Sequence, residues 1–416
     1  MARAMAVTTS SVKASTISVS DICDKLESEY KRLEFAKAVE KGAAFFRDKL
    51  EFVTFHESNH SYETDLHPSG TPLLSASSFS KVLTPPIPWR SISKNIFFSS
   101  NPETRNKYKN ILVGATSPEE FFKKFTEKNL KTARRGTTFH AIIETFFMYG
   151  HLNYFRGIDD DDNNDNNDNN DNEEEKAEET TDGPPPVKKV KRDKKKEPFI
   201  IELYQFYDFF TNFIADKYVP LICEVSIIGR DYPACGTVDS LFCEKYAFDE
   251  GGGGGGGNGS YVPENVILFD WKTISSHSIL FDAKQRRCSK GLGPLSDTRC
   301  TKLKLYELQL SVYADILTTP INLYGLRDIK ASLVFFSNDA SEKNVLVLPV
   351  SLYNKKEMLD IYEFCFRSEN IKKLENLLHS TGGGDGDGDG GGGGGNESGG
   401  GGKSSENIAP RPLENK

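Results

Sequence analysis

Two charged residues stand at the end of an apolar segment near the middle of the chain. Residues 266–275 read VILFDWKTIS, and their first four residues are apolar and partly β-branched, as in a buried strand. Asp270 and Lys272 follow with one residue between them, so both side chains point to the same face of that strand. Burying a carboxylate and an ammonium costs free energy unless the groups are paired or used. The pattern therefore indicates a functional site at this strand end.

A second carboxylate lies on the preceding predicted strand. Asp239 is inside GTVDSLFCE, residues 236–244, where a lone aspartate is disfavoured. If this strand and the segment 265–274 pair as a hairpin, Asp239 and Asp270 come side by side. Two carboxylates held that close raise each other's pKa, and a divalent cation would remove the repulsion.

Two predicted helices carry polar residues at helical spacing. His140 and Glu144 are four residues apart, as are Gln309 and Tyr313, so each pair shares one helix face. Oxygen ligands with a single imidazole suit Mg²⁺ or Mn²⁺ better than zinc. Such an ion favours hydrolysis of a phosphodiester, and Lys272 would orient the attacking water or stabilise the charge of the transition state.

Four segments in chain order, GTTFHAIIE, GTVDSL, DWKT and QLSVYA, carry these residues. Together they resemble the motifs of the PD-(D/E)XK nuclease superfamily. Their order is similar to its RecB-like exonuclease branch, to which the mitochondrial genome-maintenance exonuclease belongs. The resemblance covers roughly residues 60–340 without the low-complexity inserts, and DWKT alone would be a weak signal.

The resemblance implies a role for each matching position. Lys272 would serve the attacking water, and Gln309 and Tyr313 would organise the site or contact the DNA backbone. Glu144 would add a second-metal or outer ligand. The implied metal ligands are His140, Asp239, Asp270 and the main-chain carbonyl of Trp271. Arg134 and Arg135, just before the histidine helix, are candidate DNA contacts, with an ordinary solvated position as the alternative.

Two features depart from the family pattern. Asp239 and Asp270 are 31 residues apart, which is longer than expected unless the glycine tract 251–259 forms a loop outside the fold. Some relatives hold an iron–sulfur cluster, but Cys288 and Cys300 are far apart and no clustered cysteines occur, so we expect no such cluster. The seven cysteines stand singly without a CxxC motif, which indicates a reducing, intracellular compartment.

Hydrophobic periodicity predicts a mixed sheet flanked by helices, an α/β or α+β fold with a restriction-endonuclease-like core. The predicted helices are 21–53, 118–130, 134–149, 198–217, 303–317 and 354–379. The predicted strands are 221–229, 236–244, 265–274, 330–338 and 344–350.

Low-complexity segments divide the chain. An acidic, Asn-rich run occupies residues 159–179, a basic cluster occupies 188–196, and glycine tracts occupy 251–259 and 382–402. The resulting organisation is a disordered N-terminus over 1–20, a helical part with the first core helix over 21–157, a disordered insert over 158–197, the nuclease core over 198–380 and a disordered tail over 381–416.

The net charge of -8 comes largely from the acidic run and does not argue against a nucleic-acid partner. We expect a monomer that acts on DNA, with no membrane partner, since no apolar stretch reaches transmembrane length. The basic cluster favours the nucleus, whereas the acid-free residues 1–20 favour a mitochondrion, so localisation stays undecided. The homopolymeric inserts indicate a eukaryotic or viral source.

The leading functional prediction is a Mg²⁺-dependent deoxyribonuclease, an exonuclease on single strands or DNA ends in replication, recombination or repair. An endonuclease of the same superfamily is the first alternative. The second is a nucleic-acid-binding module that does not cut, although His140, Asp239, Asp270 and Lys272 are all present.

Overall fold

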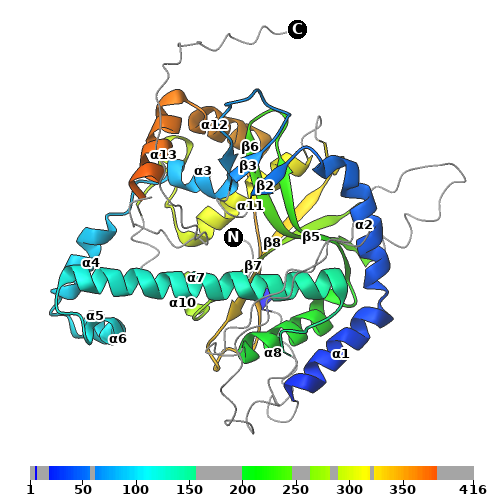
Figure 1. Cartoon of the computed structure of the whole chain (residues 1–416), viewed down its shortest axis with the longest axis horizontal. Helices are drawn as coiled ribbons and strands as arrows, with labels where there is room; N and C mark the ends of the chain where they lie inside the picture. The colour runs from blue at the N-terminus through cyan, green and yellow to red at the C-terminus, as the bar shows by residue number, and fades with distance from the viewer. Residues whose placement is uncertain are drawn as a thin grey trace, which may run out of the picture.

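The computed structural model describes residues 5–6, 18–56, 61–155, 199–245, 263–281, 289–318 and 323–381. These residues form a mixed α/β fold in which helices flank a central mixed sheet, as the sequence predicts (Figure 1). One continuous hydrophobic core includes residues from both sides of the insert, from Val19 to Leu374. The segments before and after the insert therefore fold as one body around one core.

Five strands make up most of the sheet. They are β5 (Tyr218–Ile228), β6 (Ala234–Glu244), β7 (Val266–Ile274), β8 (Ile329–Ser337) and β9 (Leu346–Pro349). Neighbours in this series pair antiparallel, except for β7 and β8, which pair in parallel. The parallel pair needs a crossover, and helix α11 (Lys302–Thr318) supplies it. Two short strands complete the sheet: β1 (Met5–Ala6) beside β9, and β4 (Leu74–Ser75) beside β6.

Strand β6 is paired unequally on its two sides. On one side β5 accompanies it from Cys235 to Glu244. On the other side β7 pairs only with Ser240–Cys243, and β4 pairs only with residues 234 and 235. Residues 236–239 therefore have no strand partner on that side within the described part of the sheet. This opening in the sheet is where the predicted site residue Asp239 lies.

A single helix crosses the front of the sheet (Figure 1). Helix α7 runs from Pro118 to Tyr149 over 32 residues, and the predicted break between 130 and 134 is wrong. Ser117 caps its N-terminus, Pro118 occupies its first turn, and Gly150 ends it in a left-handed conformation. Glycine suits position 136, where α7 crosses β7, because the Cβ of a larger residue would lie only 2.9 Å from Thr273 Oγ1.

An aromatic core joins α7 to the sheet. Phe147 packs edge-on against Phe242 of β6 and stacks with Trp271 of β7, with ring centroids 4.9 and 6.0 Å apart. Helix α8 (Ile200–Phe209), which continues as a π-helical turn from Phe210 to Ile214, adds Phe209 to Trp271. Such pairs contribute roughly 0.5–1.5 kcal/mol each beyond burial. They fix α7 against the face of β7 opposite to Asp270 and Lys272.

Two other predicted helices are each divided in the structure. Residues 21–53 form α1 (Val19–Arg32) and α2 (Phe35–Leu50), because Glu34 takes a left-handed conformation between them. The C-terminal helix divides into α12 (Lys355–Cys365) and α13 (Ser368–Thr381). The N-terminal region was predicted to be disordered to residue 20, yet residues 5–6 pair with β9 and α1 begins at Val19.

Smaller elements surround this core. A two-stranded hairpin, β2 (Thr54–His56) and β3 (Ser61–Glu63), precedes helix α3 (Ala76–Leu83), which packs on α11. Three short helices gather at the N-terminal end of α7: α4 (Trp89–Phe97), α5 (Pro102–Lys107) and α6 (Lys109–Leu112) (Figure 1). The remaining elements are α10 (Ser278–Phe281) and the short 3₁₀ turn η4 (Gly293–Leu295).

The predictions for the insert 158–197, the glycine tract 251–259 and the tail beyond residue 381 lie outside the described residues. So does the predicted nuclear import cluster, 188–196.

Gly42 is where α2 lies closest to β5, and its substitution tests that packing. A Cβ there would come 2.7 Å from the main-chain carbonyl carbon of Leu221. We expect Gly42→Ala to lower the free energy of unfolding by roughly 1–3 kcal/mol through overpacking, although alanine is the better helix former by about 1 kcal/mol. Urea denaturation measures this, with Ala44→Ser at an exposed position of α2 as the control. Equal or greater stability of Gly42→Ala would contradict the close approach.

Candidate metal centre

The candidate site forms where β6 and β7 separate. Their last paired residues are Ser240 and Phe269, and the next residues along each strand are Asp239 and Asp270. Beyond that point the Trp271 N–H donates to Asp239 Oδ2, at 2.8 Å, in place of a main-chain carbonyl. The predicted juxtaposition of the two aspartates in a hairpin is thus confirmed, and one aspartate closes the end of the ladder.

Three side chains converge into a compact group of possible metal ligands. His140 of α7, Glu224 of β5 and Asp239 of β6 each place one ligand atom within 4.8 Å of the others. His140 Nδ1 lies 3.6 Å from Asp239 Oδ2. The helix, the bulged strand and the central strand therefore each contribute one donor to this group.

Glu224 was not predicted as a site residue. Strand β5 shifts register between Pro220 and Ile222, and Glu224 then takes a left-handed conformation with φ of 49°. The flanking pairs Cys223–Ser240 and Val225–Val238 place Glu224 opposite Asp239. A glutamate inside LICEVSIIG was the available signal, because a charged residue is out of place in a buried strand. The left-handed backbone is a costly conformation, and such conformations concentrate at functional sites.

Asp270 lies beside this group and is paired with Lys272. Its side chain is only 1% exposed, and Lys272 Nζ lies 2.9 Å from Oδ1 and 2.8 Å from Oδ2. This buried Oδ2 accepts no hydrogen bond among the described residues, although it belongs to the ion pair with Lys272. Asp270 therefore keeps an acceptor site that a cation could use.

Burial shifts the pKa values of His140, Asp239 and Asp270. It lowers the pKa of His140 to about 4, helped by the Lys272 charge, whereas Asp270 and a hydrogen bond to the Trp271 main chain oppose the shift. It raises the pKa of Asp239, against the effects of Lys272 and the Trp271 N–H. It also raises the pKa of Asp270 to about 6, and Asp239 adds to this while Lys272 opposes it. The buried carboxylates repel each other, as the sequence indicated.

The pKa of Lys272 shifts in the direction that favours its charged form, unlike the pKa values of the other three groups. Burial alone would lower its pKa, but Asp270 and Asp239 outweigh that effect and raise the pKa well above the ordinary value. Its ammonium also lies over the ring of Tyr306, 5.0 Å from the centroid. Tyr306 is a residue that sequence reasoning missed, one helical turn before Gln309 on α11. Lys272 is thus held between a carboxylate pair and an aromatic face.

Gln309 and Tyr313 form the α11 wall of the site. Gln309 Nε2 donates to the Tyr313 hydroxyl at 2.9 Å. Burial raises the pKa of Tyr313 well above its ordinary value, and Asp270 and Asp239 contribute. A Cβ at Gly236 would lie 3.2 Å from Tyr313 Cζ, so glycine allows the tyrosine to approach β6 closely. The structure therefore brings both residues to the site, with Tyr313 buried in its wall.

The three remaining candidates are placed differently. Glu144 lies half-buried one turn beyond His140 on α7, outside the compact group of three ligands. Arg135 forms a 2.5 Å ion pair with the buried Glu202 and lies over the ring of Phe199, at 4.3 Å. Its guanidinium is thus engaged inside the protein, whereas Arg134 is exposed.

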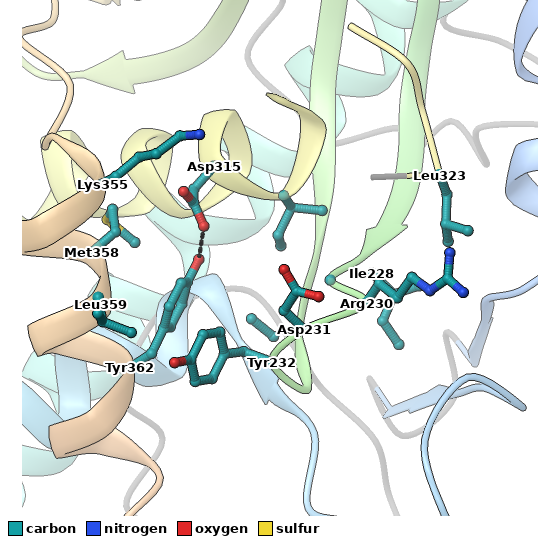
Figure 2. A pocket seen from close by; sticks show the side chains of 13 residues that line it. Ile228, Arg230, Asp231, Tyr232, Asp315, Leu323, Lys355, Met358, Leu359 and Tyr362 are labelled. Carbon is teal, nitrogen blue, oxygen red and sulfur yellow. Dashed lines mark hydrogen bonds between the residues drawn. The ribbon is translucent and has the colours of Figure 1, made fainter. Parts of the chain in front are cut away.

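A separate cavity is lined in part by residues of α11 and α12 (Figure 2). Asp315 accepts a hydrogen bond from the Tyr362 hydroxyl at 3.0 Å, and Lys355 and Asp231 also line the cavity. Asp315 is two residues from Tyr313, which places the two side chains on opposite sides of the helix. None of the proposed metal ligands lines this cavity. It is therefore distinct from the candidate metal centre.

No family model matches the chain, and no curated protein shows detectable similarity to it. Among the described residues, no helix is both long and apolar enough to cross a membrane.

The shifted groups should affect stability in opposite directions as the pH falls. Neutral His140 stabilises the fold above pH 6.5, and that contribution is lost toward about pH 4 because only the unfolded chain takes up the proton. Asp270 contributes stability below pH 3.8, and that contribution is lost as the pH rises through about 6. The effects of His140 and Asp270 therefore oppose each other, and the raised pKa of Asp239 acts in the same direction as that of Asp270.

We therefore expect each single variant to show the effect of the remaining group on the pH dependence of stability. In EDTA, as the pH falls from about 7 to about 4, the free energy of unfolding of Asp270→Asn should decrease relative to that of wild type. That of His140→Gln should increase relative to wild type, and each difference should reach up to about 3 kcal/mol. Urea unfolding at several pH values measures this difference. Parallel stability curves for both variants and wild type would contradict the assigned shifts.

Proposed function

We propose that the chain is a metal-dependent deoxyribonuclease that hydrolyses phosphodiester bonds. The observation that carries this proposal is the convergence of His140, Glu224 and Asp239 beside the buried Asp270–Lys272 pair, where two strands separate. Buried carboxylates with raised pKa values and a locked lysine are costly for the fold alone. Their concentration at one strand end supports a catalytic role.

The donor set fits a hard divalent cation. One imidazole and carboxylate oxygens from Glu224 and Asp239 come together, and Asp270 has an oxygen without a hydrogen-bond donor. This oxygen-rich set favours Mg²⁺ or Mn²⁺ over zinc. When bound, the cation would neutralise a phosphate oxygen and lower the pKa of a water.

Lys272 has a role that its charge state defines. Because its pKa is raised well above the ordinary value, the ammonium stays protonated and cannot take a proton from water. It can instead orient the attacking water and stabilise negative charge on the phosphoryl group. Asp270 holds Lys272 in place, and Tyr306 limits the directions in which the ammonium can point.

DNA as the substrate follows from the sequence resemblance, and so does the preference for an exonuclease acting on single strands or ends. An endonuclease with the same site would cut circular DNA as well, which separates the two activities experimentally. A module that binds without cutting would need no locked lysine beside the carboxylates.

Activity on labelled DNA tests the proposal. Purified full-length protein should degrade end-labelled strands with Mg²⁺ or Mn²⁺, and EDTA should abolish the reaction. Lys272→Ala should lower kcat by roughly 10²–10³-fold, the usual cost of losing a charge-stabilising donor, and Asp239→Asn should remove activity. Lys330→Ala, an exposed lysine of β8, is the matched control. Full activity of Lys272→Ala would refute the assigned site, and intact circles would identify an exonuclease.

Glu224 and Glu144 provide an internal comparison. If the compact group binds the cation, Glu224→Gln should raise the Mn²⁺ concentration needed for half-maximal activity about 10-fold or more, in the range seen when metal-site partners are lost. Glu144→Gln, half-buried outside that group, should change it little. Calorimetric titration of Mn²⁺ into each variant gives a readout independent of activity. A larger effect of Glu144→Gln than of Glu224→Gln would instead identify Glu144, on α7, as the third metal ligand.

A further inference from the structure

A basic helical arm projects at the N-terminal end of α7. We define the arm as residues 85–135, which include α4, α5, α6 and the first half of α7. It contains eleven Lys and Arg residues against four Asp and Glu residues, in a chain whose net charge is -8. Between residues 85 and 117 the only acidic residue is Glu103. Residues 85–135 therefore carry a formal net charge of +7 (eleven minus four), opposite in sign to that of the whole chain.

The same arm exposes large apolar side chains. Of the nine large hydrophobic residues exposed in the described part of the chain, four lie between residues 87 and 113. They are Ile87, Trp89, Phe98 and Val113, which are 56%, 37%, 64% and 68% exposed. Apolar side chains gathered among basic residues are typical of a binding surface.

The arm is packed against α7 rather than loosely attached. Trp89 contacts Phe125 of α7, and Tyr108 contacts both Phe121 and Phe125, with ring centroids about 6 Å apart. Lys124 pairs with Glu120 and donates to the Gly114 carbonyl, which closes the loop between α6 and α7. The exposed rings and charges are thus presented from a fixed scaffold.

Helix α7 connects this scaffold to the candidate metal centre. Exposed Arg134 precedes His140 by six residues, a rise of about 9 Å along the helix. The N-terminus of α7, where α4, α5 and α6 gather, is about 33 Å from His140 along the helix, so a strand bound there would reach the site by following α7.

We propose that the basic arm binds single-stranded nucleic acid and delivers the strand to the metal centre. Its lysines and arginines can bind the phosphates, and the exposed rings of Trp89 and Phe98 offer faces on which unpaired bases can stack. A duplex would hide its bases from these rings. The inference rests on the proposed function for the identity of the strand as substrate, but binding itself needs neither metal nor catalysis.

Binding by an inactive full-length protein tests the arm. Fluorescence anisotropy of a labelled oligothymidylate would be followed in EDTA with Asp239→Asn as the background. Adding Arg105→Gln, Lys107→Gln and Lys109→Gln should weaken binding at least about 10-fold and reduce the slope of log K against log salt by about 2, as expected for three lost phosphate contacts. Phe98→Ala should weaken binding by roughly 5- to 100-fold with an unchanged salt slope, since it removes stacking alone.

A matched triple variant on the opposite side of the molecule controls for net charge. Lys25→Gln, Lys31→Gln and Arg47→Gln remove the same charges from exposed positions of α1 and α2, which lie far from the arm (Figure 1). This control should bind as the Asp239→Asn parent does. Equal weakening by both triple variants would overturn the inference in favour of a general charge effect.

Other outcomes separate this inference from the proposed nuclease activity. Binding that needs the arm, without cutting by the wild type, would reject the activity and keep the arm as a strand-binding surface. Cutting by the wild type, with unchanged strand binding by the arm variants, would reject the arm alone. Binding to vesicles of phosphatidylserine and phosphatidylcholine, without binding to the oligonucleotide, would also overturn the inference.

Discussion

The early separation of β6 from β7 is the constraint on which the site depends. The ladder stops at Ser240 and Phe269, so the next peptide N–H, that of Trp271, has lost its strand partner. Asp239 supplies the missing acceptor, which fixes one carboxylate at the opening. His140 can then reach Asp239 through the opening, from a helix whose aromatic residues pack on the face of β7 opposite to Asp270. The same residue, Asp239, thus satisfies the backbone N–H at the end of the ladder and places a possible metal ligand at the opening.

The stability of this arrangement comes from outside the site. The buried carboxylates repel each other, and their attraction to Lys272 only partly offsets this repulsion and the cost of burying them. The aromatic cluster of Phe147, Phe209 and Trp271 holds α7 and β7 together behind them. A close-packed apolar layer can support a polar site that would be unfavourable on its own. The fold and the candidate site therefore share strand β7, whose alternate residues serve each purpose.

Most of the fold could be predicted from the sequence because strands and helices of this chain have strong periodicity. The predictions that failed depend on single backbone conformations. Left-handed Glu34 divides one predicted helix in two, whereas the polar residues around 131 do not interrupt α7. In the site, Asp239 and Asp270 were predictable from adjacent strands. Glu224 was missed, because the register shift between Pro220 and Ile222 and the left-handed conformation of Glu224 set its direction, and hydrophobic periodicity shows neither.

The crossing of α7 over β7 at Gly136 has a mechanical consequence. The helix extends about 27 Å from this point to its N-terminus but only about 6 Å to His140, at 1.5 Å per residue. If the helix pivots as a rigid rod about the crossing, its outer end moves more than about four times as far as the imidazole. A large displacement of the arm would therefore become a small displacement of the His140 imidazole. Such a lever reduces any movement of the outer end of the helix before it reaches the imidazole.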